Sequence, residues 1–111
     1  MTEEKIHTVV KCFAEEARKI YGSKLQKIIL YGSCVRGDFK IDSDIDILVL
    51  LNVESEEISA ERKRILDVTD RLDLDYDVVL APVFLSFQIF EKYRNVSVFY
   101  QTVQKEGVKI A

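Results

Sequence analysis

Two apolar runs joined by a short polar segment constrain the fold of this chain more than any other feature. The first run is followed by Gly32-Ser33, and the second contains Asp44-Ile45-Asp46. Successive side chains of a strand point to opposite faces, so Asp44 and Asp46 share one face and Ile45 lies on the other. Both runs are strongly apolar and β-branched, which is typical of buried central strands.

The two carboxylates predict a cation site. Like charges held this close repel, and the apolar residues around them exclude the water that would screen them, so the pair needs a cation. Carboxylate oxygens are hard ligands of the kind that suits Mg²⁺. At the end of the first strand, Gly32 lets the backbone approach a phosphate, and the helical turn after it points free N–H groups the same way. The pattern therefore predicts that a phosphate and a metal ion meet in one site.

This pattern closely resembles the nucleotidyltransferase signature of the DNA polymerase beta superfamily. The first matching features are Gly32-Ser33, a spacer of ten residues containing Arg36-Gly37-Asp38, and Ser43 before Asp44-x-Asp46. The later ones are Tyr76-Asp77-Val78-Val79, which matches the strand of the third carboxylate, and Glu106-Gly107-Val108, which matches the terminal motif. In its short length the chain resembles members of the minimal nucleotidyltransferase branch, which are antitoxins paired with HEPN-domain toxins.

The resemblance implies an enzyme, a protein adenylyltransferase that uses ATP and Mg²⁺. Asp44 and Asp46 would hold magnesium on the triphosphate, and Asp77 would bind the metal nearer the attacking hydroxyl. The residues that would bind the leaving phosphates are Gly32, Ser33 and Arg36. The acceptor implied for this branch is a tyrosine hydroxyl of the HEPN toxin, which addition of AMP would inactivate.

Two other classes of function are also compatible with the sequence. The chain could neutralise its partner by contact alone, as a binding module whose nucleotide site has no catalytic role. It could also act on a small molecule, as a nucleotidyltransferase whose acceptor pocket is built across a dimer interface.

For the third carboxylate ligand of the metal, Asp75 competes with Asp77. We prefer Asp77 because Tyr76 and Val78 flank it, where an ionised carboxylate is costly without a cation.

Composition excludes several other classes. The 111 residues are 48% apolar, which suits one domain at residues 1–111 around a single core. A net charge of −3, with no long basic cluster, argues against direct nucleic-acid binding. No apolar run approaches the roughly 20 residues of a membrane helix, and the charged start is unlike a signal peptide, so we expect a cytoplasmic protein. Cys12 and Cys34 lack the spacing of a zinc site.

Apolar periodicity predicts the remaining elements. We expect helices at residues 3–21, 55–72, 83–94 and 97–106, and strands at residues 25–31, 45–52 and 74–80. If the Gly-Ser turn and all three carboxylates meet at one edge of the sheet, the first two strands are antiparallel. The second and third strands are then parallel, and the helix at 55–72 supplies their crossover. The expected architecture is the α/β, two-layer nucleotidyltransferase fold with a small mixed sheet.

The expected helix at residues 83–94 is apolar on almost every side. So small a domain has little protein with which to bury every face of a helix, so this pattern predicts contact with a partner, either a second copy or the toxin. The alternative is a tightly packed core helix.

Overall fold

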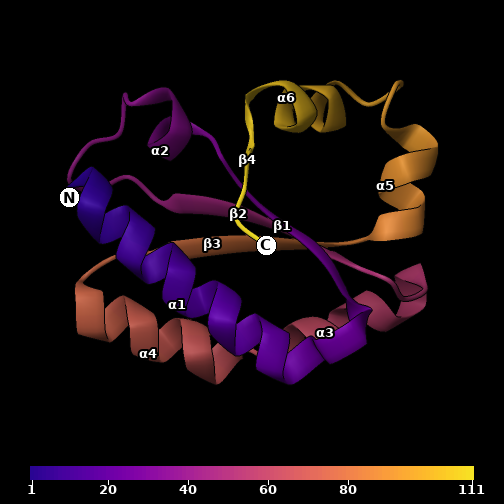
Figure 1. The fold of residues 1–111 in the computed structure, drawn as a ribbon, viewed down its shortest axis with the longest axis horizontal. Helices are drawn as coiled ribbons and strands as arrows, with labels where there is room; N and C mark the ends of the chain where they lie inside the picture. Colours follow the sequence, from indigo (N-terminus) through magenta and orange to yellow (C-terminus); the bar gives the residue numbers. More distant parts are fainter.

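The computed structural model describes residues 1–111 and contains one sheet with the strand order β3-β2-β1-β4 (Figure 1). The central pair, β1 (Leu25–Tyr31) and β2 (Ile45–Leu51), is antiparallel. At the two edges, β3 (Leu80–Ser86) runs parallel to β2, and β4 (Val108–Lys109) runs antiparallel to β1. The α/β class and the mixed strand directions expected from the sequence are confirmed.

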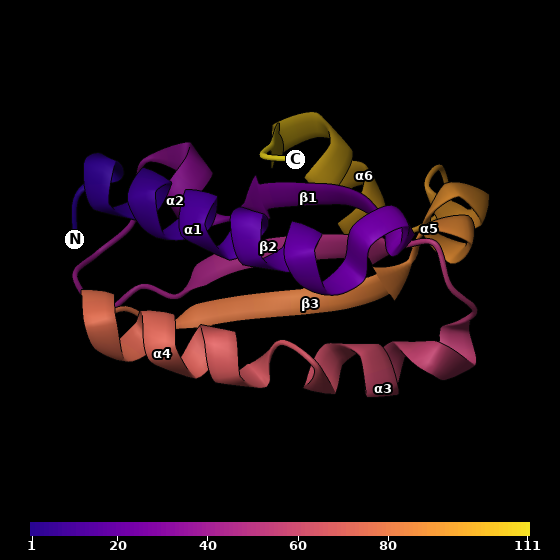
Figure 2. The ribbon, with the colours of Figure 1, turned by 60° about the horizontal axis from the view of Figure 1, so that its bottom comes forward.

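The helices lie on both sides of this sheet. α1 (Glu3–Tyr21), α3 (Ile58–Lys63) and α4 (Leu66–Tyr76) belong to one side, and α5 (Phe87–Tyr93) and α6 (Val98–Glu106) belong to the other. Figure 2 shows α3 and α4 below the sheet and α6 above it. Short turns complete the chain: α2 (Ser33–Arg36) and the 3-10 turns Gly22–Lys24 and Ser55–Glu57. None of the helices is both long and apolar enough to cross a membrane.

The first helix forms as its sequence predicts. The Thr2 hydroxyl accepts a hydrogen bond from the Lys5 N–H at 3.1 Å and caps the start, while Gly22 ends the helix with a φ of 54°. The apolar stripe along one side of α1 is buried against the sheet, and its buried residues are Ile6, Val9, Val10, Phe13, Ala14, Ala17 and Tyr21.

The crossover helix expected at residues 55–72 is interrupted between α3 and α4. The Tyr21 hydroxyl donates to the Glu61 carbonyl at 2.6 Å, and the Arg64 guanidinium donates to the Ile20 carbonyl at 2.8 Å. Burial, with the nearby charge of Glu61, raises the pKa of Tyr21 to about 12 against the opposing charge of Arg64. These two hydrogen bonds therefore link the crossover segment to the end of α1.

The third strand begins at Leu80, so its prediction at residues 74–80 is wrong. The buried stripe of α4 runs through Val68 and Leu72 and continues one turn later to the half-buried Tyr76, so the helix includes the first part of the segment, residues 74–76. Asp77 then ends α4 in the left-handed conformation, with a φ of 53°. A short alternation of acidic and apolar residues fits both the last turn of a helix and a strand. Here packing of the apolar stripe of α4 favours the helix.

The helix expected at residues 83–94 is also shorter than predicted. Its first residues lie in β3, and α5 begins at Phe87. Pro82, which suggested a helix start, lies within β3, where it is tolerated because an edge strand has N–H groups that need no partner. Phe90 of α5 is only 2% exposed. The apolar residues at 83–94 thus belong partly to a strand and partly to a short, partly buried helix. Their pattern alone therefore no longer indicates a partner surface.

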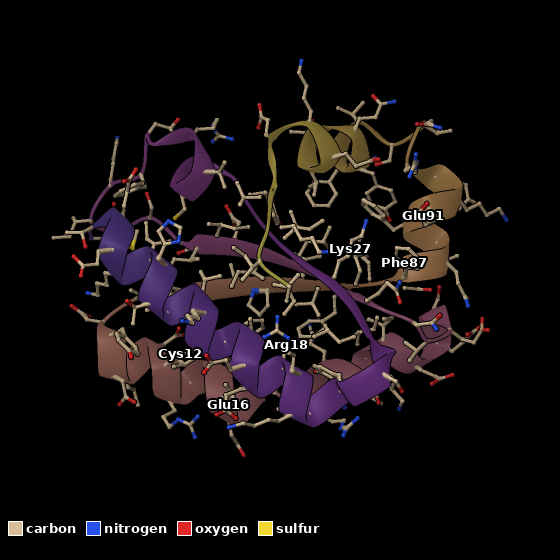
Figure 3. The ribbon with its side chains drawn as sticks, viewed as in Figure 1. Cys12, Glu16, Arg18, Lys27, Phe87 and Glu91 are labelled. Atoms are coloured by element: carbon tan, nitrogen blue, oxygen red, sulfur yellow. The ribbon has the colours of Figure 1, made fainter.

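Two apolar clusters, one on each side of the sheet, hold these layers together. The larger joins α1 and α4 to the sheet residues Ile28, Leu30, Ile45, Ile47, Val49, Leu51, Leu80 and Phe84. The smaller consists of Ile29, Leu48, Leu50, Phe90 and Val103, beneath α5 and α6. At its margin the Lys27 ammonium lies 5.9 Å from the centre of the Phe87 ring. Figure 3 labels both side chains, which come from β1 and α5.

Candidate active site

The turn after β1 can be made only by a residue without a side chain. Gly32 has a φ of 80°, in the region that glycine favours, and it starts the single turn of α2. A Cβ at this position would overlap the Asp46 carboxylate oxygen Oδ2. The Gly-Ser turn and the second carboxylate are therefore in contact, as the sequence pattern requires.

Asp44 and Asp46 lie together at the start of β2. The β1–β2 register places Asp46 opposite Tyr31, on the side of the sheet that carries α6, and leaves Asp46 half-buried. Asp44 is exposed, and its backbone carbonyl accepts a 3.7 Å hydrogen bond from the Cys34 thiol of α2. This bond ties the strand of the carboxylates to the turn that follows Gly32.

The charge on Asp46 is only partly compensated. Burial raises the pKa of Asp46, the neighbouring charge of Asp44 raises it further, and Arg36 opposes both. The same charge acts on its surroundings, because burial and then Asp46 raise the pKa of Tyr31 and of the Cys34 thiol. A cation bound to the two carboxylates would relieve this repulsion, and their hard oxygen atoms suit Mg²⁺.

Arg36 is the basic residue of the site. In this structure its guanidinium reaches Asp38 at 3.5 Å and Glu106 of α6 at 3.7 Å. Both ion pairs are exposed, so they hold Arg36 weakly, and a phosphate could replace them. Ser33, the first residue of α2, is half-buried next to Gly32.

The third carboxylate does not join the other two. Asp77 is exposed at the end of α4, and Asp75 is exposed within the last turn of that helix. No three residues of the types His, Cys, Asp and Glu come together as a group that could hold a metal ion. Asp77 does lie close in the chain to Val79, whose carbonyl accepts from the Ile45 N–H at 2.8 Å. It is therefore at the same end of the sheet as Asp44.

Asp73 is an acidic residue that the sequence pattern did not single out. Its carboxylate accepts a 2.9 Å hydrogen bond from the Leu80 N–H, which links α4 to the start of β3. Burial raises the pKa of Asp73, the bond from Leu80 lowers it, and the charges of Asp70 and Asp44 raise it again. Its position one helical turn before Asp77 was the available signal, but that signal required α4 to be recognised as a helix.

Comparison with known proteins gives one family match and two similar proteins along nearly the whole chain. The nucleotidyltransferase domain family matches residues 10–110. Two proteins of Methanocaldococcus jannaschii, each named "putative protein adenylyltransferase", align with nearly the whole chain. One is 31% identical over 102 residues, which are 92% of this chain and 95% of the relative. The other is 36% identical over 107 residues, which are 96% of each protein.

The fold is also similar to that of solved toxin–antitoxin structures. One, a toxin–antitoxin with AMP-PNP, matches with a TM-score of 0.54 and 23% identity, covering 100% of this chain and 73% of the other. A mutant of the toxin–antitoxin MntA-HpeT matches with the same TM-score and coverage at 22% identity. At this level of identity the likeness supports the fold alone.

Proposed function

Because this chain belongs to the nucleotidyltransferase domain family, we propose that it is a protein adenylyltransferase that transfers AMP from ATP to a tyrosine of a partner protein. The observation that carries the proposal is the contact between Gly32 and Asp46, which joins a phosphate-binding turn to a pair of carboxylates. The two relatives named for protein adenylyl transfer support the choice of donor and of acceptor class.

The transfer can be written with the residues of this site. The tyrosine oxygen forms a bond to the α-phosphorus of ATP, the bond from that phosphorus to the bridging oxygen breaks, and pyrophosphate leaves. Asp44 and Asp46 would hold Mg²⁺, which neutralises the triphosphate and the charge that develops on the leaving group. The phosphates would be bound by Gly32, Ser33 and Arg36, with Arg36 leaving its exposed ion pairs.

Asp77 is our candidate for the third carboxylate, near the attacking hydroxyl. Its support is its match to the family motif and its place at the same end of the sheet as Asp44. In this role it would take the phenolic proton as the new bond forms. Asp73 is the second candidate, because the charge of Asp44 contributes to its raised pKa.

The proposed partner is a HEPN-domain toxin that forms a hetero-oligomer with this chain. The support is the resemblance of the sequence motif to the minimal nucleotidyltransferase branch, and two structures of similar fold are described as toxin–antitoxin. Modification of the toxin would free the enzyme for another turnover, whereas inhibition by contact would consume it in equal amounts.

The test mixes the chain, its partner toxin, Mg²⁺ and ATP, and follows the intact mass of the toxin. Each transferred AMP adds about 329 Da, as expected for a covalent adenylyl group. Wild type should raise the mass of the toxin even when there is less enzyme than toxin. The double variant Asp44→Asn with Asp46→Asn should leave the mass of the toxin unchanged. Asp77→Asn should still bind ATP but lose transfer, because its contact forms mainly in the transition state. The matched control is Asp75→Asn, which should transfer normally.

Other outcomes would point to other functions. If Asp77→Asn is active and Asp73→Asn is not, Asp73 is the third carboxylate. If wild type silences the toxin without any change in mass for all four nucleoside triphosphates, the chain is a binding module. If it neither modifies nor binds a toxin, a small-molecule acceptor at a dimer interface becomes the better explanation.

A further inference from the structure

An aromatic pair borders the candidate active site. Tyr31, the last residue of β1, lies opposite Asp46 in the sheet. Its ring meets the ring of Phe99 on α6 edge to face, with centroids 5.6 Å apart and an angle of 79° between the planes. The sequence alone gives no sign of this pair, because the two residues lie far apart in the chain.

Phe99 is held in place without being part of the core. It is 39% exposed and lies outside the small cluster that Tyr31 and Tyr100 pack against. A second edge-to-face contact joins it to Tyr100, with centroids 5.9 Å apart. The ring is therefore oriented on two sides and still open to solvent, although a phenylalanine gains most by complete burial.

The helix that carries Phe99 is itself firmly placed beside the site. The Ser97 hydroxyl caps α6 by accepting from the Tyr100 N–H at 3.3 Å, and Val103 is buried in the small cluster. At the other end of the helix, Glu106 pairs with Arg36. One helix thus borders both the proposed phosphate-binding residues and the carboxylate strand, and it presents an aromatic ring next to them.

We propose that Phe99, supported by Tyr31, is the surface on which the adenine base of ATP stacks. This inference rests on the proposed function, which places the phosphates at Gly32-Ser33 and the metal at Asp44 and Asp46. The base must then lie within the length of one nucleotide from Asp46, and Phe99 is the exposed ring that adjoins Tyr31 there. Base–aromatic stacking accepts any base, so Phe99 would strengthen nucleotide binding more than it selects adenine.

The experiment compares two ligands by calorimetry, Mg-ATP and magnesium tripolyphosphate, which has no base or sugar. Phe99→Ala should weaken Mg-ATP binding roughly 5- to 140-fold, the range of one base stacked on an aromatic ring, and leave tripolyphosphate binding unchanged. The matched control is Val98→Ala, at the preceding and 77% exposed position of α6, which should change neither affinity. Phe99→Leu keeps an apolar side chain of similar size and should behave like Phe99→Ala, which separates stacking from general packing.

A fluorescence measurement provides a second readout. The chain contains no tryptophan, so Phe99→Trp introduces the only indole. Its emission should change on addition of Mg-ATP and not on addition of tripolyphosphate, while its affinity for Mg-ATP should equal or exceed that of wild type.

The possible failures can be told apart. If wild type binds both ligands and loses them in Asp46→Asn, but Phe99→Ala binds Mg-ATP as well as wild type, the stacking inference is overturned and the proposed function stands. If Phe99→Ala binds Mg-ATP normally and instead weakens association with the protein acceptor, the ring is part of the docking surface and the inference is likewise wrong. If wild type binds neither ligand, the proposed function fails and the inference fails with it.

Discussion

The two faces of the sheet differ in how completely they are covered. α1, α3 and α4 cover one face over a cluster of 19 buried residues, whereas α5 and α6 cover the other over a cluster of five. The acidic pair and Tyr31 lie on the less covered face. Strand β2 belongs to both environments, because Ile45 and Ile47 point to the larger cluster while Asp46 and Leu48 point to the smaller one.

The difference shows how a small chain combines stability with chemistry. A carboxylate on the covered face would lose its hydration without gaining a partner, at a cost of several kcal/mol. On the other face Asp46 stays half-exposed, open to a cation and a phosphate. We therefore expect substitutions on the covered face to act mainly on folding, and substitutions on the open face to act mainly on function.

The largest expected effect is on stability, in a pair of identical substitutions on the two faces. Phe13 of α1 is 0% exposed in the larger cluster, so Phe13→Ala should cost about 3–5 kcal/mol of unfolding free energy. Phe99→Ala, which removes a ring outside both clusters, should cost less than about 1 kcal/mol. Urea denaturation of both variants measures the difference, and equal losses would show that the two faces do not differ as described.

A second pair separates backbone strain from damage to the site. Gly32→Ala introduces a side chain at a φ of 80°, and its Cβ would displace the Asp46 carboxylate. Displacement of a catalytic group by about 1 Å can lower a rate roughly 100-fold. Its control, Gly22→Ala, has a φ of 54° but no atom within 4 Å of the new Cβ. Both variants should lose about 1–3 kcal/mol of stability, because neither backbone conformation suits a residue with a side chain. Only Gly32→Ala should lose AMP transfer, which is measured from the mass of the toxin. Normal transfer by Gly32→Ala would argue against the Gly32–Asp46 contact as the centre of the site.

The smallest effect concerns the phenol of Tyr21 on the covered face. Its pKa of about 12 exceeds the ordinary value of 10, so the native state holds this proton more tightly than the unfolded chain does. The contribution of the protonated Tyr21 phenol to the free energy of unfolding is complete below pH 10 and is lost as the pH rises from about 10 to 12. Tyr21→Phe should lack this alkaline fall and lose about 1 kcal/mol at neutral pH with the bond to Glu61.

Thermal unfolding as a function of pH measures both parts of this prediction. Tyr93→Phe removes a phenol that is 43% exposed and controls for loss of any tyrosine hydroxyl. An alkaline fall that persists unchanged in Tyr21→Phe would assign it to other groups.

Local pattern was enough to predict the half of the chain that forms α1, β1, the Gly32 turn and β2. In these segments one period dominates over many residues, so the local pattern indicates helix or strand without tertiary information. The strand directions, which we predicted on the assumption that the Gly-Ser turn and the carboxylates meet at one edge of the sheet, are confirmed. The roles of the predicted site residues, Asp77 above all, stay predictions until they are measured.

The sequence by itself thus determined the helix–strand–turn–strand start of the chain and its acidic pair, because the information there is local and repeated. Only the tertiary structure decided where β3 begins, that α4 extends to Tyr76, and that Asp73 and Asp77 lie on a helix end. The segment between Leu72 and Ser86 fits a helix and a strand about equally well, so burial of Tyr76 and pairing of Leu80 with Ile45 select between them. Contacts such as Tyr31 with Phe99 depend on the packing of distant elements, which no local period records.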